Sequence, residues 1–422
     1  YNRVVKVRDE LKLPVATLFD SKGPEIRFRL FEGSKVTIND GDLFTLTTRE
    51  ILGNNTIGSI SYKNLINDVQ IGTSILVNDG LIELKVEKVG DTDIVCRVIN
   101  GGVISDRKAI NVPGVHLSLP FLSDVDRRDL EFAMKTGFDF FALSFVRCAE
   151  DVLEVRRLQK EHNNTSKLIA KIESQEGVEN LDAIIDVADG IMVARGDMGV
   201  EIPFEKVPVV QKDMISKCLK SGKFVIVATQ MLESMTHNPR PTRAEVNDVA
   251  NAIFDQTSAV MLSGESAAGD YPVEAVKTMS RICHEIEKTT TTGKFEITYN
   301  GSNLASSIAC AACSIASVIN ADAIIPVSLS GSTIRKVSGF RPNINIIGCS
   351  TNERVCRETS LMWGVTPVLI TEQEDGEALI NEVINKCKTA GVIKSGNRVV
   401  IVAGFPLRIA GATNMIRVVD VD

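Results

Sequence analysis

The sequence is poor in histidine and has no long hydrophobic run. The histidines are His116, His162, His237 and His284. They lie far apart and show no spacing of metal ligands, which argues against a histidine-based zinc site. No apolar run approaches the roughly 20 residues that span a bilayer, and the N-terminus lacks the basic and then apolar layout of a secretory signal. We therefore expect no membrane partner and a cytoplasmic location.

The chain also lacks an excess of basic residues and a disulfide pattern. Its formal charge of -7 is spread along the sequence, so we expect no nucleic-acid partner. Nine cysteines, an odd number, are scattered through apolar segments, which is typical of reduced buried thiols. Cys310 and Cys313 form the only C-x-x-C, inside an alanine-rich helical pattern. This position predicts core packing and no redox or zinc chemistry.

A strand followed by a helix recurs along much of the chain, whose 422 residues favour two or three domains. Continuous apolar runs that each precede an amphipathic helix predict parallel strands covered on one side by helices. The runs are Val15 to Phe19, Phe140 to Phe145, Leu168 to Glu173, Ile191 to Asp197, Phe224 to Thr229 and Ala259 to Ser263. We predict an α/β fold, a (β/α)8 TIM barrel formed by residues 1–23 and 118–288.

Such a barrel needs eight strands, and only six candidates are present. Because Tyr1 to Leu11 already has a helical pattern that leads into the strand at Val15, we expect the other two strands to precede residue 1. The sequence would then be N-terminally incomplete. A protein that truly starts at Tyr1 would have an open barrel, and we expect it to be inactive.

Two further segments of the chain lack this strand–helix repeat, and each predicts a domain of its own. Residues 24–117 show short alternating strands with Asn-Asp-Gly and Asn-Gly-Gly turns, which predict a small inserted all-β domain. Thr289 to Gly293 is a polar, threonine-rich linker. Beyond it, residues 289–422 predict an open α/β domain. The expected helices and strands there are Leu304 to Ile319, Ala323 to Val327, Ser332 to Gly339, Ile344 to Gly348, Glu353 to Trp363 and Arg398 to Ala403.

Polar side chains follow the apolar runs at the end of the barrel where reactive groups gather. Lys171 and Glu173 end one strand two positions apart, so they point to the same side of it, and Arg195 and Asp197 do the same on the next strand. The two carboxylates would suit Mg²⁺ or Mn²⁺. The alternative is that they form salt bridges with Lys171 and Arg195 that only close the barrel.

Lys171 beside a divalent cation is the pairing that phosphoryl transfer needs, because negative charge accumulates on the moving group. Thr229, Ser263 and Glu265 end the next two strands and could hold a water molecule or pass a proton. A threonine at a strand end is also common as a residue that caps the backbone, so this role depends on its context.

Several ordered motifs are distributed over essentially the whole chain. The signature-like segment is Leu168 to Glu201, with the sequence LIAKIESQEGVENLDAIIDVADGIMVARGDMGVE. Further matches are DSKGPEIR at Asp20 to Arg27, NVPG at Asn111 to Gly114, SFVR at Ser144 to Arg147, ATQMLESM at Ala228 to Met235, NPRPTRAE at Asn238 to Glu245 and MLSGESA at Met261 to Ala267. Together these motifs resemble those of the pyruvate kinase family. The resemblance implies transfer of the phosphoryl group of phosphoenolpyruvate to ADP, giving pyruvate and ATP in glycolysis.

The resemblance also implies a role for each candidate residue. Glu173 and Asp197 would hold Mg²⁺, and Lys171 would neutralise the transferring group. Thr229 would lie where the enolate is protonated, with Ser263 and Glu265 in a water relay behind it. The substrate pocket would contain Ser144, Phe145, Ala194, Arg195, Gly196, Asp197 and Thr229.

A potassium site and a nucleotide site are implied as well. Asp20 and Ser21 match two potassium ligands of the family, and Glu25 matches the glutamate that accompanies potassium dependence, so we expect K⁺ activation. Arg27 and Lys108 would contact the nucleotide, with Lys108 closing over its phosphates. The family also implies a homotetramer.

The C-terminal domain resembles the effector domain of the family. Ser328, Ser330, Gly331, Ser332 and Thr333 precede a helix, where hydroxyls and backbone amides form a ready phosphate site. The alternative is simple N-capping by Ser332. Leu329 replaces a residue that is often polar, and Arg408 is the only strong cation of Gly404 to Thr413. The phosphorylated allosteric effector could be a sugar monophosphate, a sugar bisphosphate, a nucleotide monophosphate or none.

Two rival functions remain. A metal-dependent lyase or aldolase acting on pyruvate or phosphoenolpyruvate would also stabilise an enolate at a barrel mouth. The inserted domain argues against it, because a lid over a nucleotide is superfluous there. A non-catalytic metabolite sensor is disfavoured because Lys171, Glu173, Asp197 and Thr229 occur together.

Overall fold

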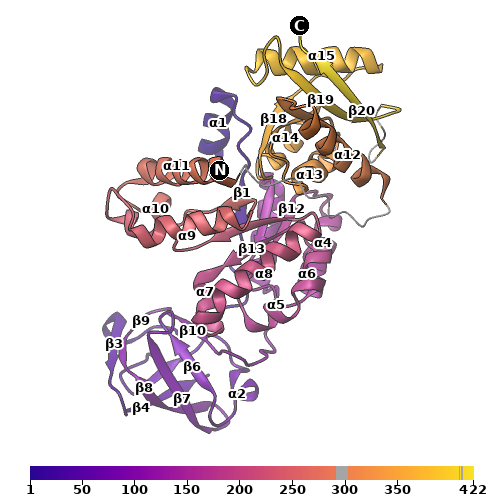
Figure 1. The fold of residues 1–422 in the computed structure, drawn as a ribbon. Coiled ribbons are helices and arrows are strands. Elements are labelled where there is room, and N and C mark those ends of the chain that lie inside the picture. The colour runs from indigo at the N-terminus through magenta and orange to yellow at the C-terminus, as the bar shows by residue number, and fades with distance from the viewer. Residues whose placement is uncertain (291–302, 408, 410–411) are drawn as a thin grey trace.

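The protein folds into a curled parallel sheet with an all-β domain at one end and an α/β domain at the other, as the computed structural model in Figure 1 shows. The structure describes residues 1–290, 303–407, 409 and 412–422. Of the expected linker, positions 291–293 lie outside these residues, and a helix continues through Thr290. None of the described helices is both long enough and apolar enough to cross a membrane.

The central sheet has six parallel strands in the order β1-β11-β12-β13-β14-β15. They are β1 (Leu18–Asp20), β11 (Phe140–Leu143), β12 (Lys167–Ile172), β13 (Gly190–Ala194), β14 (Phe224–Ala228) and β15 (Ala259–Val260). All six predicted strands are thus present, and they form the wall of a (β/α) barrel. The two strands expected before residue 1 stay a prediction.

Helices cover the outer face of this sheet, where the largest apolar core lies. The helices of the barrel region are α1 (Asn2–Leu11), which buries no residue, α3 (Asp124–Thr136), α4 (Ala149–Glu161), α5 (Gln175–Glu179), α6 (Leu181–Val187), α7 (Arg195–Glu201), α8 (Val207–Lys220), α9 (Arg243–Phe254), α10 (Gly264–Ala267) and α11 (Pro272–Thr290). Two of them begin with reciprocal capping boxes, Ser123 with Asp126 at α3 and Thr242 with Glu245 at α9. These pairs satisfy backbone amides that a helix start leaves without partners.

The inserted all-β domain is a seven-stranded sheet in the order β2-β10-β6-β7-β8-β4-β5, with β3 and β9 paired separately. The strands are β2 (Ile26–Arg27), β3 (Lys35–Ile38), β4 (Leu43–Thr47), β5 (Ile57–Ser59), β6 (Ser74–Val77), β7 (Ile82–Val89), β8 (Asp93–Asn100), β9 (Gly102–Ser105) and β10 (Ala109–Asn111), and the short helix is α2 (Leu65–Asp68). It has its own core. The Asn111 side chain donates to the Glu201 carboxylate over 2.9 Å and joins this domain to the barrel.

The C-terminal domain is a five-stranded sheet in the order β18-β17-β16-β19-β20, in which only β20 is antiparallel. Its strands and helices are α12 (Leu304–Val318), β16 (Ala323–Pro326), α13 (Ser332–Gly339), β17 (Asn345–Ser350), α14 (Glu353–Thr359), β18 (Val365–Leu369), α15 (Gly376–Thr389), β19 (Arg398–Gly404) and β20 (Thr413–Asp420). The helix expected to reach Trp363 ends at Thr359. Cys310 and Cys313 are free thiols buried on α12, as predicted.

The C-terminal domain contacts the barrel at the end where the barrel strands begin. Arg354 of α14 donates to Phe138 O and Ser166 Oγ, and Arg357 pairs with Asp139 over 2.9 Å. Asp139 directly precedes β11 and also accepts from the backbone amide of Thr17, ahead of β1. Polar contacts from α14 therefore join the starting ends of these barrel strands, while the all-β domain lies at their far ends (Figure 1).

Candidate active site

Lys171 is the centre of a cluster of polar side chains where β12 ends. Its ammonium donates to Ser144 Oγ over 2.8 Å and lies 3.1 Å from Asp20 Oδ1 and 3.2 Å from Glu173 Oε1. Burial works to lower the pKa of Lys171, but the charges of Glu173 and Asp20 outweigh it and raise this pKa. The side chain therefore stays cationic at neutral pH.

The ends of β1 and β11 supply the other members of this cluster. Ser144 Oγ donates to Ser21 O over 2.7 Å, and the Ser144 amide donates to Ser21 Oγ over 3.0 Å. Phe145 has a positive φ of 55° and donates its amide to Glu173 Oε2 over 2.6 Å. The structure therefore brings together Asp20, Ser21 and Ser144 around the Lys171 ammonium, on the strand ends where the sequence predicts them.

Glu173 is almost fully buried, with a residue exposure of 1%. Burial raises its pKa to about 7, the Lys171 charge opposes this rise, and the Asp197 carboxylate adds to it. Burial also raises the pKa of Asp197, and the charges of Asp79 and Glu25 act in the same direction. The Asp197 charge thus makes the ionised form of the buried Glu173 less favourable.

Arg195 and Asp197 are not on a strand, and that prediction is wrong. The strand β13 ends at Ala194, and Arg195 to Glu201 form the helix α7. Tertiary contacts account for this, because the Arg195 guanidinium donates to Ala228 O and Thr229 O and pairs with Asp248 over 2.6 Å. The sequence also left open that Glu173 and Asp197 form salt bridges with Lys171 and Arg195. The Lys171–Glu173 pair is present, but Arg195 pairs with Asp248 and not with Asp197.

Thr229 joins the end of β14 to the start of α7. Its hydroxyl accepts from the Gly196 amide over 2.8 Å and donates to Ala228 O over 2.6 Å, in a backbone with φ of 67°. These are the contacts of a residue that caps the backbone. Thr229 and Ser263 nevertheless line one cleft of about 1380 Å³ together with Arg195, Gly196 and Asp197.

Glu265 lies behind this cleft and has no exposed surface. Its carboxylate accepts from the Ser263 amide over 2.7 Å and from the Leu232 amide over 3.0 Å. The carboxylate therefore fixes the backbone of the two loops that follow β14 and β15. The structure brings Glu265 within reach of Ser263 but not into the lining of the cleft.

The all-β domain contributes acidic and basic residues beside Asp197. Arg27 forms two hydrogen bonds of 2.8 Å with Glu25, and the Asp197 charge helps to raise the Arg27 pKa, after the bond to Glu25. A second cleft, of about 1370 Å³, is lined by Glu25, Phe145 and Asp197. Lys108 lies half-buried between β9 and β10 and lines neither cleft.

Sequence reasoning missed Asp79. This residue lies in the turn between β6 and β7 with a φ of 56°, lines the cleft of Asp197 and Thr229, and raises the pKa of Asp197. The sequence analysis treated its Asn-Asp-Gly context only as a turn signal. The available signal was an acidic residue at the tip of a turn in an inserted domain.

The residues fit a divalent cation on electrostatic grounds. Glu173 and Asp197 are hard oxygen donors, and burial raises the pKa of each, together with the Asp197 charge at Glu173 and the charges of Asp79 and Glu25 at Asp197. A bound cation would offset both effects. Within the described ranges, there is no group of three or more histidine, cysteine, aspartate and glutamate side chains arranged to hold a metal, so other ligands would have to come from substrate or water.

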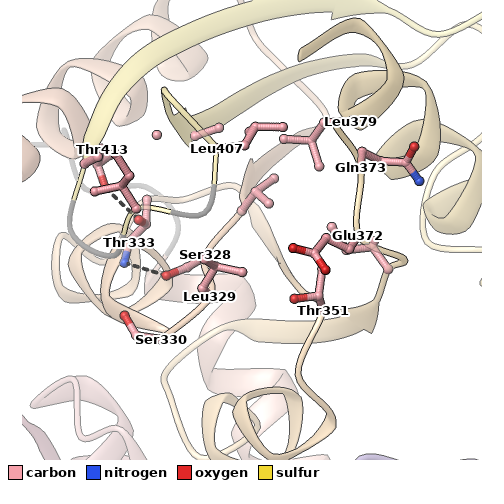
Figure 2. Close-up of a pocket in the computed structure, with 16 residues that line it drawn as sticks. Ser328, Leu329, Ser330, Thr333, Thr351, Glu372, Gln373, Leu379, Leu407 and Thr413 are labelled. Atoms are coloured by element: carbon pink, nitrogen blue, oxygen red, sulfur yellow. Dashed lines mark hydrogen bonds between the residues drawn. The ribbon is translucent and has the colours of Figure 1, made fainter. Parts of the chain in front are cut away.

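A separate pocket of about 630 Å³ lies in the C-terminal domain at the predicted effector loop (Figure 2). Ser328 Oγ accepts from the Thr333 amide over 3.4 Å, and the Thr333 hydroxyl is 2.7 Å from that of Thr413. Gly331, with a φ of 78°, is the N-cap residue of α13, so the alternative of N-capping by Ser332 is wrong. Ser332 is the first residue of the helix itself and does not line the pocket.

The lining of this pocket combines hydroxyls with apolar and acidic side chains. Figure 2 shows Leu407 and Leu379 along one side of the pocket, and Glu372 and Thr351 on the side that faces Ser328 and Leu329. The lining residues that the structure describes include no lysine or arginine. Arg408, the cation considered in the sequence, lies outside the described residues.

Comparisons with known proteins point to one family along nearly the whole chain. Residues 1–276 match the family model described as pyruvate kinase, barrel domain, and residues 306–419 match the one described as pyruvate kinase, alpha/beta domain. A pyruvate kinase of Clostridium acetobutylicum is 46% identical over 420 residues, which cover 98% of this chain and 89% of that protein. A pyruvate kinase of Staphylococcus aureus is 43% identical over 418 residues, which cover 98% of this chain and 72% of that protein.

A solved structure is similar over the full length. The crystal structure of a pyruvate kinase from Cryptosporidium parvum has a TM-score of 0.91 and 38% sequence identity, and the match covers 100% of this chain and 87% of that one. The resemblance found in the sequence motifs is therefore confirmed.

Proposed function

The chain belongs to the pyruvate kinase family, an enzyme family of the phosphotransferase class, and we propose that it transfers the phosphoryl group of phosphoenolpyruvate to ADP. In this direction the products are pyruvate and ATP. The observation that carries the proposal is the Lys171 ammonium, held by Ser144, Asp20 and Glu173 at the mouth of the barrel.

Lys171 would neutralise the phosphoryl group during transfer. Its ammonium is kept protonated and is held in place by three oxygen atoms, so little reorganisation is needed when charge develops. Glu173 and Asp197 would hold Mg²⁺ or Mn²⁺, which supplies positive charge against the substrate carboxylate and the developing negative charge. The raised pKa of both carboxyls supports this role, since a bound cation favours their ionised forms.

Residues 194 to 197 and Thr229 would position the organic part of the substrate. Ala194 ends β13, and Gly196 follows it at the start of α7 beside the Thr229 hydroxyl. Thr229 and Ser263 share a cleft, with Glu265 directly behind Ser263. In our proposal this group delivers the proton to the enolate carbon after phosphoryl transfer, through water that Ser263 holds.

We propose a potassium site and a nucleotide site beside the Lys171 cluster. Asp20 and Ser21 are the proposed potassium ligands, and the Glu25–Arg27 pair at the start of the all-β domain follows them in the chain. Arg27 and Lys108 are the proposed nucleotide contacts. Lys108 lines neither described cleft, so its contribution requires the all-β domain to close over the bound nucleotide.

The cellular location, assembly and regulation in our proposal are those that membership of the family implies. We propose a cytoplasmic, homotetrameric enzyme of glycolysis with regulation through the C-terminal pocket, where Ser328, Ser330, Gly331 and Thr333 would bind a phosphorylated effector with support from Ser332 at the helix start. Replacing both Ser330 and Thr333 with alanine is expected to abolish activation by a sugar phosphate. Unchanged activation would exclude this loop as its site.

An assay of ADP-dependent pyruvate formation from phosphoenolpyruvate tests the proposed reaction. We expect stoichiometric ATP and pyruvate, both lost without Mg²⁺ or Mn²⁺. Pyruvate formation without ADP consumption would instead indicate a lyase, and binding of phosphoenolpyruvate without turnover would indicate a sensor. Lys160→Met, a change at an exposed lysine on α4, is a suitable control for variants of Lys171.

A further inference from the structure

Asn111 begins the Asn-Val-Pro-Gly motif, to which the proposed reaction gives no role. It is the last residue of β10 and directly precedes the segment that leads from the all-β domain back to the barrel. Its side-chain amide donates to a carboxylate oxygen of Glu201 over 2.9 Å, and Glu201 is the last residue of α7. The bond therefore joins the all-β domain, at the point where the chain leaves it, to the helix that carries Asp197.

The Glu201 carboxylate has Asn111 as its only hydrogen-bond partner among the described residues. Glu201 is half-buried and lines the second cleft together with Asn111 and Asp197. Burial raises the pKa of Glu201, the hydrogen bond from Asn111 opposes this rise, and the charge of Asp197 adds to it. The Asn111 amide is therefore the protein group that stabilises the charged form of Glu201.

A second contact joins the same parts of the two domains. Asn111 pairs with Leu76 of β6, so the turn that follows β6 lies beside the end of β10. In this turn, a Cβ atom added to Gly80 would lie 3.7 Å from Val200 Cγ1, one residue before Glu201. The neighbouring strands β6 and β10 thus both reach the C-terminal end of α7.

The other end of α7 is fixed to the barrel. Arg195 donates to Thr229 O over 2.7 Å, and the Gly196 amide donates to Thr229 Oγ1 over 2.8 Å. Asp197 and Glu201 are four residues apart, so they lie on the same face of this helix. With seven residues, α7 is only about 10 Å long. The position of the all-β domain at Glu201 is thereby linked to the turn that carries Asp197.

The proposed nucleotide contacts lie directly beside Asn111 in the all-β domain. Arg27 of β2 pairs with Ala109 of β10, and its guanidinium donates to Arg107 O over 2.8 Å. Lys108 lies between these two partners of Arg27 in the chain. Fixing the end of β10 on α7 therefore also fixes where Arg27 and Lys108 stand relative to the barrel.

We propose that the Asn111–Glu201 hydrogen bond is a hinge latch that holds the all-β domain on α7, and that Asn111 is a positioning residue for nucleotide binding. The latch sets the distance between the cations of the all-β domain and the Lys171 cluster of the barrel. Its effect on nucleotide binding rests on the proposed function. The latch itself does not, because it is a contact between two domains of the protein without substrate.

Exchanging the two functional groups tests the latch. Asn111→Asp places two carboxylates against each other, whereas Asn111→Asp combined with Glu201→Gln restores a hydrogen bond in the opposite direction at the net charge of the parent. Hydrogen–deuterium exchange, followed by mass spectrometry of peptides that cover α7, measures how firmly this helix is held. We expect exchange at least about tenfold faster in Asn111→Asp and close to the parental rate in the double variant.

Steady-state kinetics test the positioning role. We expect the KM for ADP to rise at least about tenfold in Asn111→Asp, more than the KM for phosphoenolpyruvate, and to recover in the double variant. Asn111→Ala removes the bond without adding charge and should shift both measurements in the same direction. The control is Asn67→Asp, the same change at an exposed asparagine of α2, which is expected to behave as the parent in both measurements.

The latch is overturned if Asn111→Asp and Asn111→Ala leave exchange in α7 unchanged, or if the double variant exchanges as fast as Asn111→Asp. Faster exchange with an unchanged KM for ADP would overturn the positioning role. A parent protein that forms no pyruvate would contradict the proposed function, and the exchange rates would still decide for or against the latch.

Discussion

Replacing Glu173 with glutamine is expected to make the metal-free protein more stable above pH 7 while abolishing its activity. Glu173 is 1% exposed, and burial raises its pKa from the usual 4.5 to about 7. Lys171, 3.2 Å away, offsets only part of this burial effect. The carboxylate therefore costs folding free energy that its function requires.

The direction in which pH changes the unfolding free energy follows from proton linkage. Between pH 4.5 and 7 the folded protein holds more protons at Glu173 than the unfolded chain does, so the unfolding free energy falls as pH rises through this window. The shift to about 7 corresponds to about 3 kcal/mol. Glutamine loses one of the two bonds with Lys171 and Phe145, which costs about 1 kcal/mol. The expected net gain at pH 8 is about 2 kcal/mol.

Chemical denaturation in EDTA, followed by circular dichroism, measures the difference at pH 8 and pH 5. We expect Glu173→Gln to be about 2 kcal/mol more stable at pH 8 and close to the parent at pH 5. Glu274→Gln, a change at a half-exposed carboxylate of α11, is the matched control and should show little effect at either pH. A Glu173→Gln protein that is destabilised equally at both pH values would refute the reasoning, because Lys171 would then outweigh burial.

Three other outcomes follow from the same contacts. Lys171→Met is expected to lower kcat by about 10²- to 10³-fold in a steady-state assay, because loss of one group that stabilises transition-state charge typically has this effect. A kcat near that of the parent would contradict the role of Lys171. Arg357→Met should lower the unfolding free energy by about 2 kcal/mol, because it removes the 2.9 Å partner of Asp139, whose side chain is 1% exposed but keeps its bonds from Thr17 and its ion pair with Arg8. Adding Asp139→Asn to that variant should recover part of the loss, and additive losses would show that the pair is not coupled. Omitting K⁺ should strongly reduce turnover, whereas full activity with Mg²⁺ and no monovalent cation would exclude the potassium site.

The repeating pattern of the sequence was sufficient to predict the barrel strands. Buried parallel strands are continuous apolar runs. Five of the six appear as such between Phe140 and Val260, and the sixth leads into Asp20. Lys171 and Glu173 were predictable together because strand alternation alone places them on one side. The structure adds that Ser144 and Asp20 complete their surroundings, through contacts between residues more than 100 positions apart.

Local patterns failed where tertiary contacts decide the backbone. The apolar run from Ile191 predicts a strand as far as Asp197, but bonds from Arg195 to the end of β14 start a helix at that point. The strand expected from Ala259 to Ser263 ends at Val260.

A crystal structure with Mn²⁺ and oxalate tests the central claim most directly. We expect an anomalous peak for manganese within about 2.3 Å of a carboxylate oxygen of both Glu173 and Asp197, with the Lys171 ammonium facing the oxalate. Manganese bound at another place, or held by neither of these carboxylates, would contradict the proposed chemistry.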